Sequence, residues 1–290
     1  MKRCIRCNAR YARPGWDCEN CGYSPALRDG IPAFAPDLDL RDDDYDPIYF
    51  EKLAIVEQDN FWFQSRNRLI RSAAVKYSPN PQHVLEIGCG SGFVLKGLRE
   101  TFPAARFAAS DIHCSGLRVA AQRNGDGVEF MQMDARAIPF RDEFDLVGCF
   151  DVVEHIEEDL AVLGEIHAAL KPGGILIATV PQHMWLWSPS DVAARHKRRY
   201  ERAELVRKLA TSGFGTLFAT SFVSLLLPAM MLARWNDRRR GDYDLDREFG
   251  LPSFMNRSFK AVCAIERFLI GCGITFPMGG SLLVVARRPK

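Results

Sequence analysis

The sequence predicts an α/β protein whose main domain is built on a largely parallel sheet, and three observations support this. From about residue 82, short apolar segments typical of buried strands alternate with segments of helical periodicity. A glycine-rich turn, Gly88 to Gly92, directly follows the first of these strands. Acidic residues, Asp111 and Asp134, stand where the next two strands end. Ligands of open α/β sheets bind at the carboxyl ends of the strands, so we expect the functional site at that edge.

The composition is that of a globular protein with nearly balanced charge. The chain has 290 residues, 47% of them hydrophobic, which is enough for one large domain and a small appendage. Its 38 Lys and Arg against 36 Asp and Glu give a net charge of +2, without the basic excess usual for nucleic-acid binding. The longest apolar stretch, Phe222 to Ala233, is too short to span a bilayer. No signal-peptide pattern opens the chain, so we expect a cytoplasmic location with reduced cysteines.

Residues 1–36 are predicted to form a small zinc ribbon. Two Cys-x-x-Cys pairs, Cys4 with Cys7 and Cys18 with Cys21, are separated by ten residues. Each pair can form a turn that offers two thiolates, and two such turns complete a tetrahedral four-sulfur site suited to Zn²⁺. Four protein ligands leave no open position, so we expect the metal to be structural.

Residues 37–80 are predicted to be an acidic linker followed by helices. The linker carries six aspartates: Asp37, Asp39, Asp42, Asp43, Asp44 and Asp46. Apolar residues at helical spacing between Tyr49 and Tyr77 predict the helices. They include three successive aromatic residues, Phe61 to Phe63, which cannot all face one core. Either the helices dock on the main domain, or they form a lid in which Trp62 or Phe63 stacks on a cofactor and Arg66 meets a carboxylate.

The main domain, residues 81–290, begins with the predicted strand His83 to Ile87. The string Glu-Ile-Gly-Cys-Gly-Ser-Gly, from Glu86 to Gly92, resembles the first motif of class I S-adenosylmethionine (SAM)-dependent methyltransferases. It lacks the GxGxxG spacing of dinucleotide sites because Gly92 follows Gly90 by only two residues. The resemblance implies a Rossmann-like fold of seven strands. It also implies that Glu86 orders the loop near the methionine end of SAM. The loop residues expected against the cofactor are Gly88, Cys89, Gly90 and Gly92.

The motifs after the next two strands resemble those of the same family. The predicted strand Arg106 to Ser110 ends in Asp111 and Ile112, about 20 residues past the glycines, where an acid can bind a ribose diol. The predicted strand Val128 to Met133 is followed by Asp134 and Ala135. The resemblance implies that Asp134 receives the adenine amino group and that the Ala135 backbone N–H meets the ring.

Two more motifs complete the series. The buried strand Phe144 to Phe150 carries the family's fourth motif, and we expect Phe150 beside the cofactor. Lys171 to Gly174 ends a helix and leads into the strand Ile175 to Val180, which resembles the post-catalytic motif of many small-molecule methyltransferases. The order and spacing of these motifs predict that SAM is the cofactor.

Candidate catalytic residues follow the fourth strand. Methyl transfer is an in-line displacement in which the enzyme mainly aligns the nucleophile, and a base is needed only where the nucleophile carries a proton. Asp151, Glu154 and His155 resemble a string of ubiquinone-pathway O-methyltransferases, some of which hold a divalent ion there. We therefore consider His155 as a base and the three residues together as ligands of a second divalent ion. The alternative is that the string shapes only the helix start and the SAM pocket.

A second candidate cluster follows the fifth strand. The pattern W-S-x-x-D…H-x-R-R-Y, from Trp187 to Tyr200, resembles a branch of bacterial class I methyltransferases. His183 and His196 in this region are candidates for substrate contact or base chemistry. The alternative is that Arg199 and Tyr200 only anchor the next predicted helix, residues 201–212.

A helical insert, residues 225–278, separates the sixth predicted strand from the seventh, which we expect to be antiparallel. The expected segments are the strand Thr216 to Ser224, an apolar helix Leu225 to Trp235, a basic run Arg238 to Arg240, an acidic stretch Asp242 to Glu248, a second helix Asn256 to Ile270 and the strand Ser281 to Arg287. Three roles are open for the insert. It is a substrate cap, a homodimer interface, or a peripheral membrane contact through residues 222–240.

These observations predict a SAM-dependent methyltransferase acting on an O or N atom of a small-molecule acceptor. No Asn/Asp-Pro-Pro-Tyr/Phe string follows the fourth strand and no Pro-Cys pair occurs, which argues against two classes of nucleic-acid methylation. One alternative is an rRNA or tRNA base methyltransferase whose ribbon contacts RNA, since positions 1–30 hold six basic and three acidic residues. The predicted ribbon resembles the small zinc ribbons of ribosomal-RNA guanine methyltransferases and of methyltransferase activator subunits. Another alternative is a non-catalytic SAM-binding module whose ribbon recruits a partner.

Overall fold

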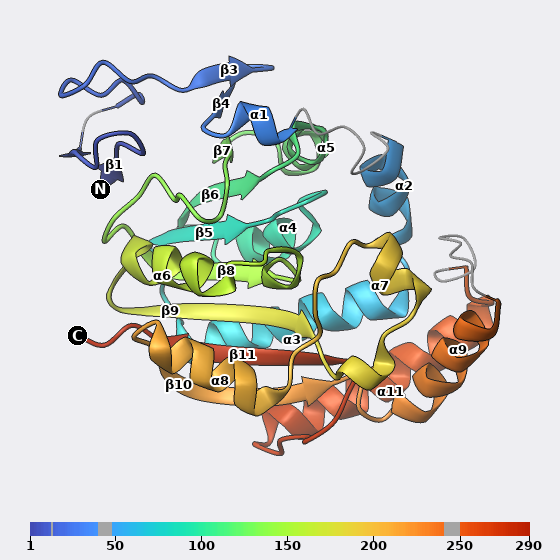
Figure 1. Ribbon diagram of the computed structural model, residues 1–290. Coiled ribbons are helices and arrows are strands. Elements are labelled where there is room, and N and C mark those ends of the chain that lie inside the picture. Colours follow the sequence, from blue (N-terminus) through green and yellow to red (C-terminus); the bar gives the residue numbers. More distant parts are fainter. Residues whose placement is uncertain (13, 40–47, 241–249) are drawn as a thin grey trace.

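The computed structural model describes residues 1–12, 14–39, 48–240 and 250–290. In this part of the chain, a nine-stranded sheet with strand order β10-β11-β9-β8-β5-β6-β7-β4-β3 forms the centre, and helices cover both faces (Figure 1). One apolar core lies on each face: the first includes Val162 and Leu205, and the second includes Leu95 and Leu117. The strands between the two cores are buried on both faces, which explains their continuous apolar sequences.

Seven strands correspond to the seven predicted for the main domain. They are β5 (His83–Ile87), β6 (Arg106–Asp111), β7 (Val128–Gln132), β8 (Phe144–Phe150), β9 (Leu170–Pro181), β10 (Gly215–Phe222) and β11 (Ser281–Arg287). Strands β5 to β9 pair in parallel, whereas β11 runs antiparallel to both β9 and β10. The predicted Rossmann-like α/β fold with an antiparallel last strand is therefore confirmed.

The connecting helices place loops over the carboxyl ends of the strands. They are α4 (Phe93–Thr101), α5 (Cys114–Asn124), the 3₁₀ turn η1 (Val153–His155), α6 (Asp159–Ala169), the 3₁₀ turn η2 (Met184–Leu186), α7 (Pro189–Ala193) and α8 (Arg202–Thr211). Helices α6 and α8 contribute to the first core, and α4 and α5 to the second.

The N-terminal segment is joined to the main sheet. It contains β1 (Lys2–Arg3), β2 (Arg10–Tyr11), β3 (Ala26–Arg28), β4 (Ile31–Ala33) and α1 (Pro36–Asp39). Strand β4 pairs in parallel with β7, and the Phe34 N–H donates to the Gln132 carbonyl at 2.8 Å. Trp16 packs edge-on against Phe34 and Phe140, with ring centroids 4.7 and 5.4 Å apart. The hairpin after the cysteines thus extends the sheet by two strands, which the sequence did not predict.

Two helices lead into the main domain, α2 (Ile48–Val56) and α3 (Phe61–Tyr77). The Asn60 side chain caps α3 by accepting from the Trp62 N–H at 2.9 Å. Of the linker aspartates, Asp37 and Asp39 belong to α1. The other four, Asp42, Asp43, Asp44 and Asp46, lie outside the described residues.

The insert forms two helices, α9 (Leu227–Arg240) and α11 (Ser253–Gly271), on the right-hand side of Figure 1, and α11 packs against α3. Helix α9 continues through the basic run that the sequence set apart from the helix. The acidic stretch Asp242 to Glu248 lies outside the described residues. Among the residues described, none of the helices has the length and apolar character needed to cross a bilayer.

Candidate active site

A cavity of about 700 Å³ lies over the carboxyl ends of β5, β8 and β9. Its walls come from helices α2 and α3, the turn after β5, the segment through η1, the loop between β9 and α8, and the two insert helices. The cavity therefore stands at the sheet edge where the sequence predicted the site.

The turn after β5 depends on glycine. Gly88, Gly90 and Gly92 have φ values of +67°, +50° and +72°, in the left-handed region that side chains disfavour. A Cβ on Gly88 would lie 2.3 Å from Cγ2 of Val152. The first glycine is thus required both by the turn and by the close approach of the segment after β8.

Glu86, at the end of β5, is a buried carboxylate that lines the cavity. Its exposed fraction is 2%, and its Oε2 has no hydrogen-bond partner among the described residues. Burial raises the pKa of Glu86 to about 8, although the charge of Arg66 opposes this shift. An acceptor oxygen without a partner at this place fits a cationic group such as the ammonium of a bound amino acid.

Arg66 of α3 lines the cavity and contacts the segment that follows β8. It forms an ion pair with Asp151 and lies over the rings of Trp62 and Phe150, at 5.1 and 5.9 Å from their centroids. The Asp151 carboxylate also accepts from Thr179 Oγ1 at 3.2 Å. The structure thus brings together Trp62, Arg66 and Phe150, which the sequence placed near the cofactor. The sequence predicted that Arg66 meets a carboxylate, and in the structure this carboxylate is that of Asp151.

The acids expected at the nucleoside end lie outside the cavity lining. Asp111 accepts from the backbone N–H of Gly90 at 2.8 Å and of His113 at 3.0 Å. Asp134 is held by Arg136, whose Nη2 lies 2.8 Å from Asp134 Oδ2. Gly92, Ile112 and Ala135 are also absent from the residues that line the cavity, and Ala135 belongs to the first core. The cavity thus includes Glu86 and the start of the glycine turn but not the two acids that the sequence assigned to the nucleoside.

Phe50 of α2 lies next to the glycine turn, outside the cavity lining. Its ring lies 3.6 Å from the position of a Cβ on Gly90 and 3.2 Å from that of a Cβ on Gly116. It also contacts the His113 ring, at a centroid distance of 6.1 Å. An aromatic side chain therefore covers the surface between the glycine turn and the start of α5.

A dyad of Asp191 and His196 faces the cavity from the loop after β9. His196 Nδ1 lies 2.8 Å from Asp191 Oδ1, and Arg199 holds the same carboxylate through Nε at 2.8 Å and Nη2 at 3.0 Å. Burial alone would raise the pKa of Asp191, but the hydrogen bonds from His196 and Arg199 hold it at about 2. The ionised carboxylate fixes Nδ1 of His196 as the donor, which leaves Nε2 with its lone pair.

Glu154 and His155 complete this cluster. Glu154 Oε1 lies 3.9 Å from His196 Nε2, and neither Glu154 oxygen has a hydrogen-bond partner among the described residues. Burial, together with the charge of Asp151, raises the pKa of Glu154 well above its usual range. The His155 ring meets that of His196 edge-on at 4.8 Å, and burial lowers the pKa of His155 to about 4. His155 is therefore neutral near pH 7.

The cluster also contains a group of metal-ligand atoms. Those of Glu154, His155 and His196 all lie within 4.8 Å of one another. Asp151, which the sequence grouped with Glu154 and His155, is occupied by Arg66 and is not in this group. His183 is also separate, since its Nδ1 lies 2.9 Å from Glu201 Oε1, its ring stacks on Trp185 at 5.1 Å, and it does not line the cavity.

Sequence reasoning missed Glu57, a buried carboxylate in the cavity wall. It accepts from Ser91 Oγ at 2.5 Å and from Arg123 Nη1 at 2.7 Å. These partners are 34 and 66 residues away in the chain, so no local motif could have indicated it.

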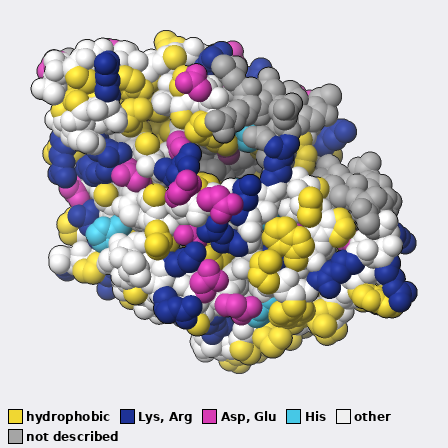
Figure 2. All heavy atoms as spheres, in the orientation of Figure 1, with side chains coloured by type: hydrophobic (Ala, Val, Ile, Leu, Met, Phe, Trp, Pro, Cys, Tyr) yellow, Lys and Arg dark blue, Asp and Glu magenta, His cyan; other side chains and the backbone are white. Residues whose placement is uncertain are grey.

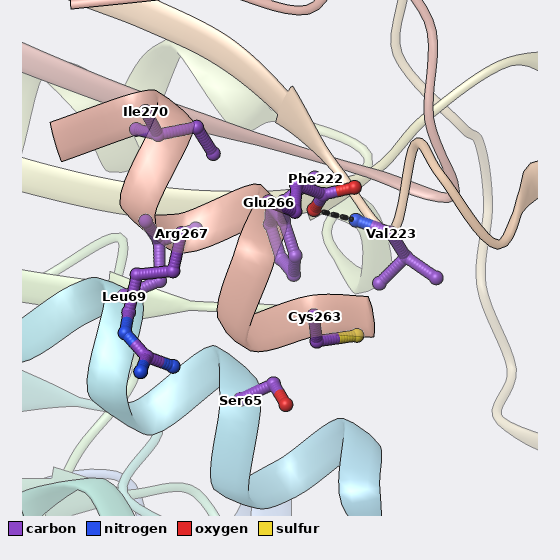
Figure 3. A pocket seen from close by; sticks show the side chains of 8 residues that line it. All are labelled: Ser65, Leu69, Phe222, Val223, Cys263, Glu266, Arg267 and Ile270. Atoms are coloured by element: carbon purple, nitrogen blue, oxygen red, sulfur yellow. Dashed lines mark hydrogen bonds between the residues drawn. The ribbon is translucent and has the colours of Figure 1, made fainter. Parts of the chain in front are cut away.

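The insert closes the cavity and is tied to the rest of the site at both ends of α9. Arg234 Nη1 donates to Ser188 Oγ at 2.7 Å, and Arg238 Nε donates to the Trp187 carbonyl at 2.8 Å. At the other end, Glu266 of α11 accepts from the backbone N–H groups of residues 223, 224 and 225, at 2.7, 2.6 and 2.8 Å. Figure 3 shows this carboxylate between α11 and the turn that leads to α9.

The four N-terminal cysteines form a separate cluster, as predicted. The Sγ atoms of Cys4 and Cys21 lie 3.6 Å apart, as do those of Cys7 and Cys18. Four sulfurs at about 2.3 Å from a Zn²⁺ ion would be separated by about 3.8 Å, so the arrangement fits this metal. All nine cysteines of the chain are free thiols.

Comparisons with known proteins agree with the fold and the motifs. Residues 85–178 match a family model described as a methyltransferase domain. A fatty-acid O-methyltransferase of Mycolicibacterium smegmatis is 32% identical over 119 residues, which cover 39% of this chain and 42% of that protein. A ubiquinone biosynthesis O-methyltransferase of Idiomarina loihiensis is 29% identical over 119 residues, covering 39% of this chain and 48% of that protein. The chain therefore spans less than half the length of these curated relatives.

One solved structure shows the likeness of fold. Haemonchus contortus phosphoethanolamine N-methyltransferase 2, in complex with S-adenosyl-L-methionine, superposes with a TM-score of 0.51 at 19% identity. The match covers 78% of this chain and 52% of that chain. Residues 85–178 are thus similar in sequence to a methyltransferase domain, and the solved structure shows that the fold is shared.

Proposed function

We propose that the protein transfers a methyl group from SAM to an O or N atom of a small-molecule acceptor bound in the cavity. When bound, SAM supplies an activated methyl group on a sulfonium. The observation that carries the proposal is the position of the Asp191–His196 dyad, which lines the same cavity as Glu86 and the glycine turn. A candidate base and a candidate cofactor site thus face one space.

The methionine end of SAM fits the charged groups of the cavity. Glu86 offers its unpartnered oxygen to the ammonium group, and Gly88 and Gly90 leave room for close backbone approach. Arg66 is the cation available to the carboxylate, beside Asp151. The nucleoside end requires that Phe50 leave its position against Gly90, after which Asp111 can meet the ribose. Asp134 and Ala135 remain our candidates for the adenine ring.

His196 is the proposed general base. Its Nε2 takes the proton of the acceptor hydroxyl or amine as the new bond to carbon forms, and Asp191 stabilises the resulting imidazolium. His155 packs against the His196 ring and stays neutral, so it adds no positive charge beside the base. His183, bonded to Glu201 outside the cavity lining, has a structural role in this proposal.

Four cysteines are proposed to hold one structural Zn²⁺ ion: Cys4, Cys7, Cys18 and Cys21. A second divalent ion on Glu154, His155 and His196 is the rival to the base assignment. Metal analysis separates the two. We expect one zinc per chain in wild-type protein and in His196→Ala. A second equivalent of metal in the wild type that is absent from His196→Ala would show that His196 is a metal ligand and not a general base.

Labelled SAM tests the function directly. Purified protein is incubated with labelled SAM and either total RNA or a metabolite extract, and we expect label in the extract only. Label in RNA would favour the alternative in which the ribbon contacts RNA. Tight binding of S-adenosylhomocysteine without label in any fraction would identify a non-catalytic module. His83→Gln, at the far end of β5 and outside the cavity lining, is the control for histidine substitutions.

A further inference from the structure

The helical insert concentrates the exposed hydrophobic surface of the molecule. Of the large hydrophobic side chains that are exposed in the described residues, more than half lie between Val223 and Gly280. Isolated exposed hydrophobic residues are ordinary, but a gathering on one element marks an interaction surface. The insert is therefore a candidate interaction surface.

Helix α9 has the composition of an interfacial helix. None of its residues is buried, and Met231, Leu232 and Trp235 are 48%, 59% and 48% exposed. The Arg239 guanidinium lies over the Trp235 ring, 3.6 Å from its centroid. Three arginines, Arg238 to Arg240, end the helix. Exposed apolar side chains, a half-exposed Trp and a basic terminus are also found in helices that bind the headgroup region of anionic bilayers.

Helix α11 presents a second apolar surface to solvent. Phe254, Ile265 and Phe268 are 75%, 56% and 69% exposed, and Ala261 is exposed between them. Successive members of this set, residues 254, 261, 265 and 268, are seven, four and three positions apart, which places them on one face of the helix. The opposite face, with Asn256, Cys263, Glu266 and Ile270, is buried. The outward stripe is thus left unpartnered in the folded chain.

The cavity reaches the surface at this insert. Leu232 of α9 and Met255 of α11 line the cavity and are nevertheless 59% and 40% exposed, so they mark its mouth. Figure 2 shows hydrophobic side chains gathered over the region of α7, η2 and α9, with Lys and Arg side chains beside them at the α9 end. The mouth of the cavity is therefore formed by residues that adjoin the exposed Met231 of α9 and Phe254 of α11.

We propose that the surface formed by α9 and α11 binds an anionic membrane, and that the methyl acceptor is an amphiphile that enters the cavity from that membrane. The acceptor part rests on the proposed function. The polar head of an amphiphile would reach His196, while its chain would lie against the apolar insert residues. An anionic bilayer complements Arg238 to Arg240, whereas a second copy of the chain would present the same arginines.

Vesicle sedimentation tests the membrane surface. Full-length protein is mixed with vesicles of phosphatidylcholine alone or with phosphatidylglycerol, at low and at physiological salt. We expect binding to the anionic vesicles that weakens with salt. The double variant Trp235→Ser/Phe268→Ser should bind at least about tenfold more weakly, since each change removes one large apolar side chain from the membrane. Neither side chain lines the cavity, so S-adenosylhomocysteine binding should be unchanged.

Leu160→Ser is the matched control, because Leu160 is a 45% exposed apolar residue of α6. It should bind vesicles as the wild type does. Equal binding of wild type and double variant, or no preference for anionic vesicles, would overturn the membrane surface. A dimer in light scattering that the double variant dissociates, without vesicle binding, would assign the surface to a second copy.

The label from SAM tests the acceptor class independently. Incorporation into the fraction extracted by organic solvent supports an amphiphile, and incorporation only into water-soluble metabolites overturns it. Vesicle binding without methylation of any fraction would overturn the proposed function but not the membrane surface. The failure of one proposal is thus distinguishable from the failure of the other.

Discussion

The floor and the roof of the cavity are built on opposite principles. The floor, at the ends of β5, β8 and β9, holds buried carboxyl groups, including Glu86, Glu154 and Asp191 with exposed fractions of 2%, 0% and 0%. The roof, from α9 and α11, is mostly apolar and largely exposed, and no residue of α9 is buried. In our proposal the floor carries the chemistry, whereas the roof admits the acceptor.

The stability of the fold explains neither the buried carboxyl groups of the floor nor the exposed apolar residues of the roof. Burying the carboxylates of Glu86 and Glu154 without a hydrogen bond on all their oxygens is unfavourable by several kcal/mol at most pH values. Leaving Leu232 or Phe268 in water forgoes about 1.5–3 kcal/mol of burial for each side chain. Such energetically unfavourable arrangements occur mainly at functional sites. Their presence in both the floor and the roof supports a function that the two share.

The largest expected effect is on the floor. His196→Ala should lower kcat by about 10²–10⁴-fold, the usual contribution of a positioned base, with little change in KM. Met230→Ala on the roof should instead raise KM for the acceptor. Steady-state kinetics on both variants checks this. An equal loss of kcat in the two variants would contradict separate roles for the floor in catalysis and the roof in acceptor binding.

A second prediction concerns the pH dependence of stability. Glu86 keeps its proton up to about pH 8 in the folded protein, whereas the unfolded chain releases it near 4.5. The unfolded state then binds fewer protons, so the free energy of unfolding falls as pH rises from 4.5 to 8, by at most about 1.4 kcal/mol per unit. Glu86→Gln should flatten this fall. Urea unfolding at several pH values without cofactor measures it, with Glu100→Gln, at an exposed position of α4, as the control.

The attachment of the roof gives a third prediction. Glu266→Gln replaces a carboxylate that accepts three backbone N–H groups by an amide with one acceptor oxygen. We expect a loss of about 1–3 kcal/mol in stability and a higher KM for the acceptor, with kcat retained. Thermal unfolding and kinetics together test this. A fall in kcat as large as that of His196→Ala would show that roof and floor act as one unit.

The smallest effect is expected at Phe50, which belongs to neither side. If cofactor binding must displace its ring from Gly90, Phe50→Ala removes that cost, and S-adenosylhomocysteine should bind a few-fold more tightly. Calorimetry measures the dissociation constant. Weaker binding would instead indicate that Phe50 stacks on the nucleoside.

The sequence predicted the local features of the protein well. Apolar runs gave the seven strands of the main domain, since residues buried on both faces of a sheet must be apolar. The pairs Cys4/Cys7 and Cys18/Cys21 predicted the four-sulfur cluster because short spacings fix the turns that hold them together. Gly88 was also predictable, since few other residues tolerate its backbone conformation.

Side-chain partners were much harder to predict. The sequence grouped Asp151 with Glu154 and His155, but Arg66 from α3 holds Asp151, and His196 takes its place near the other two. Asp134 turned out to be paired with Arg136, and His183 with Glu201. The roles assigned to these residues stay predictions.

The amino-acid order by itself determined which segments become strands, helices and metal-binding turns, because backbone preference and burial periodicity act over a few residues. Only the tertiary structure decided which charged groups meet across the cavity, that β3 and β4 join the sheet, and that the apolar faces of α9 and α11 remain uncovered. These outcomes depend on packing between segments far apart in the chain. A side chain's direction and partner follow from that packing and from no local pattern.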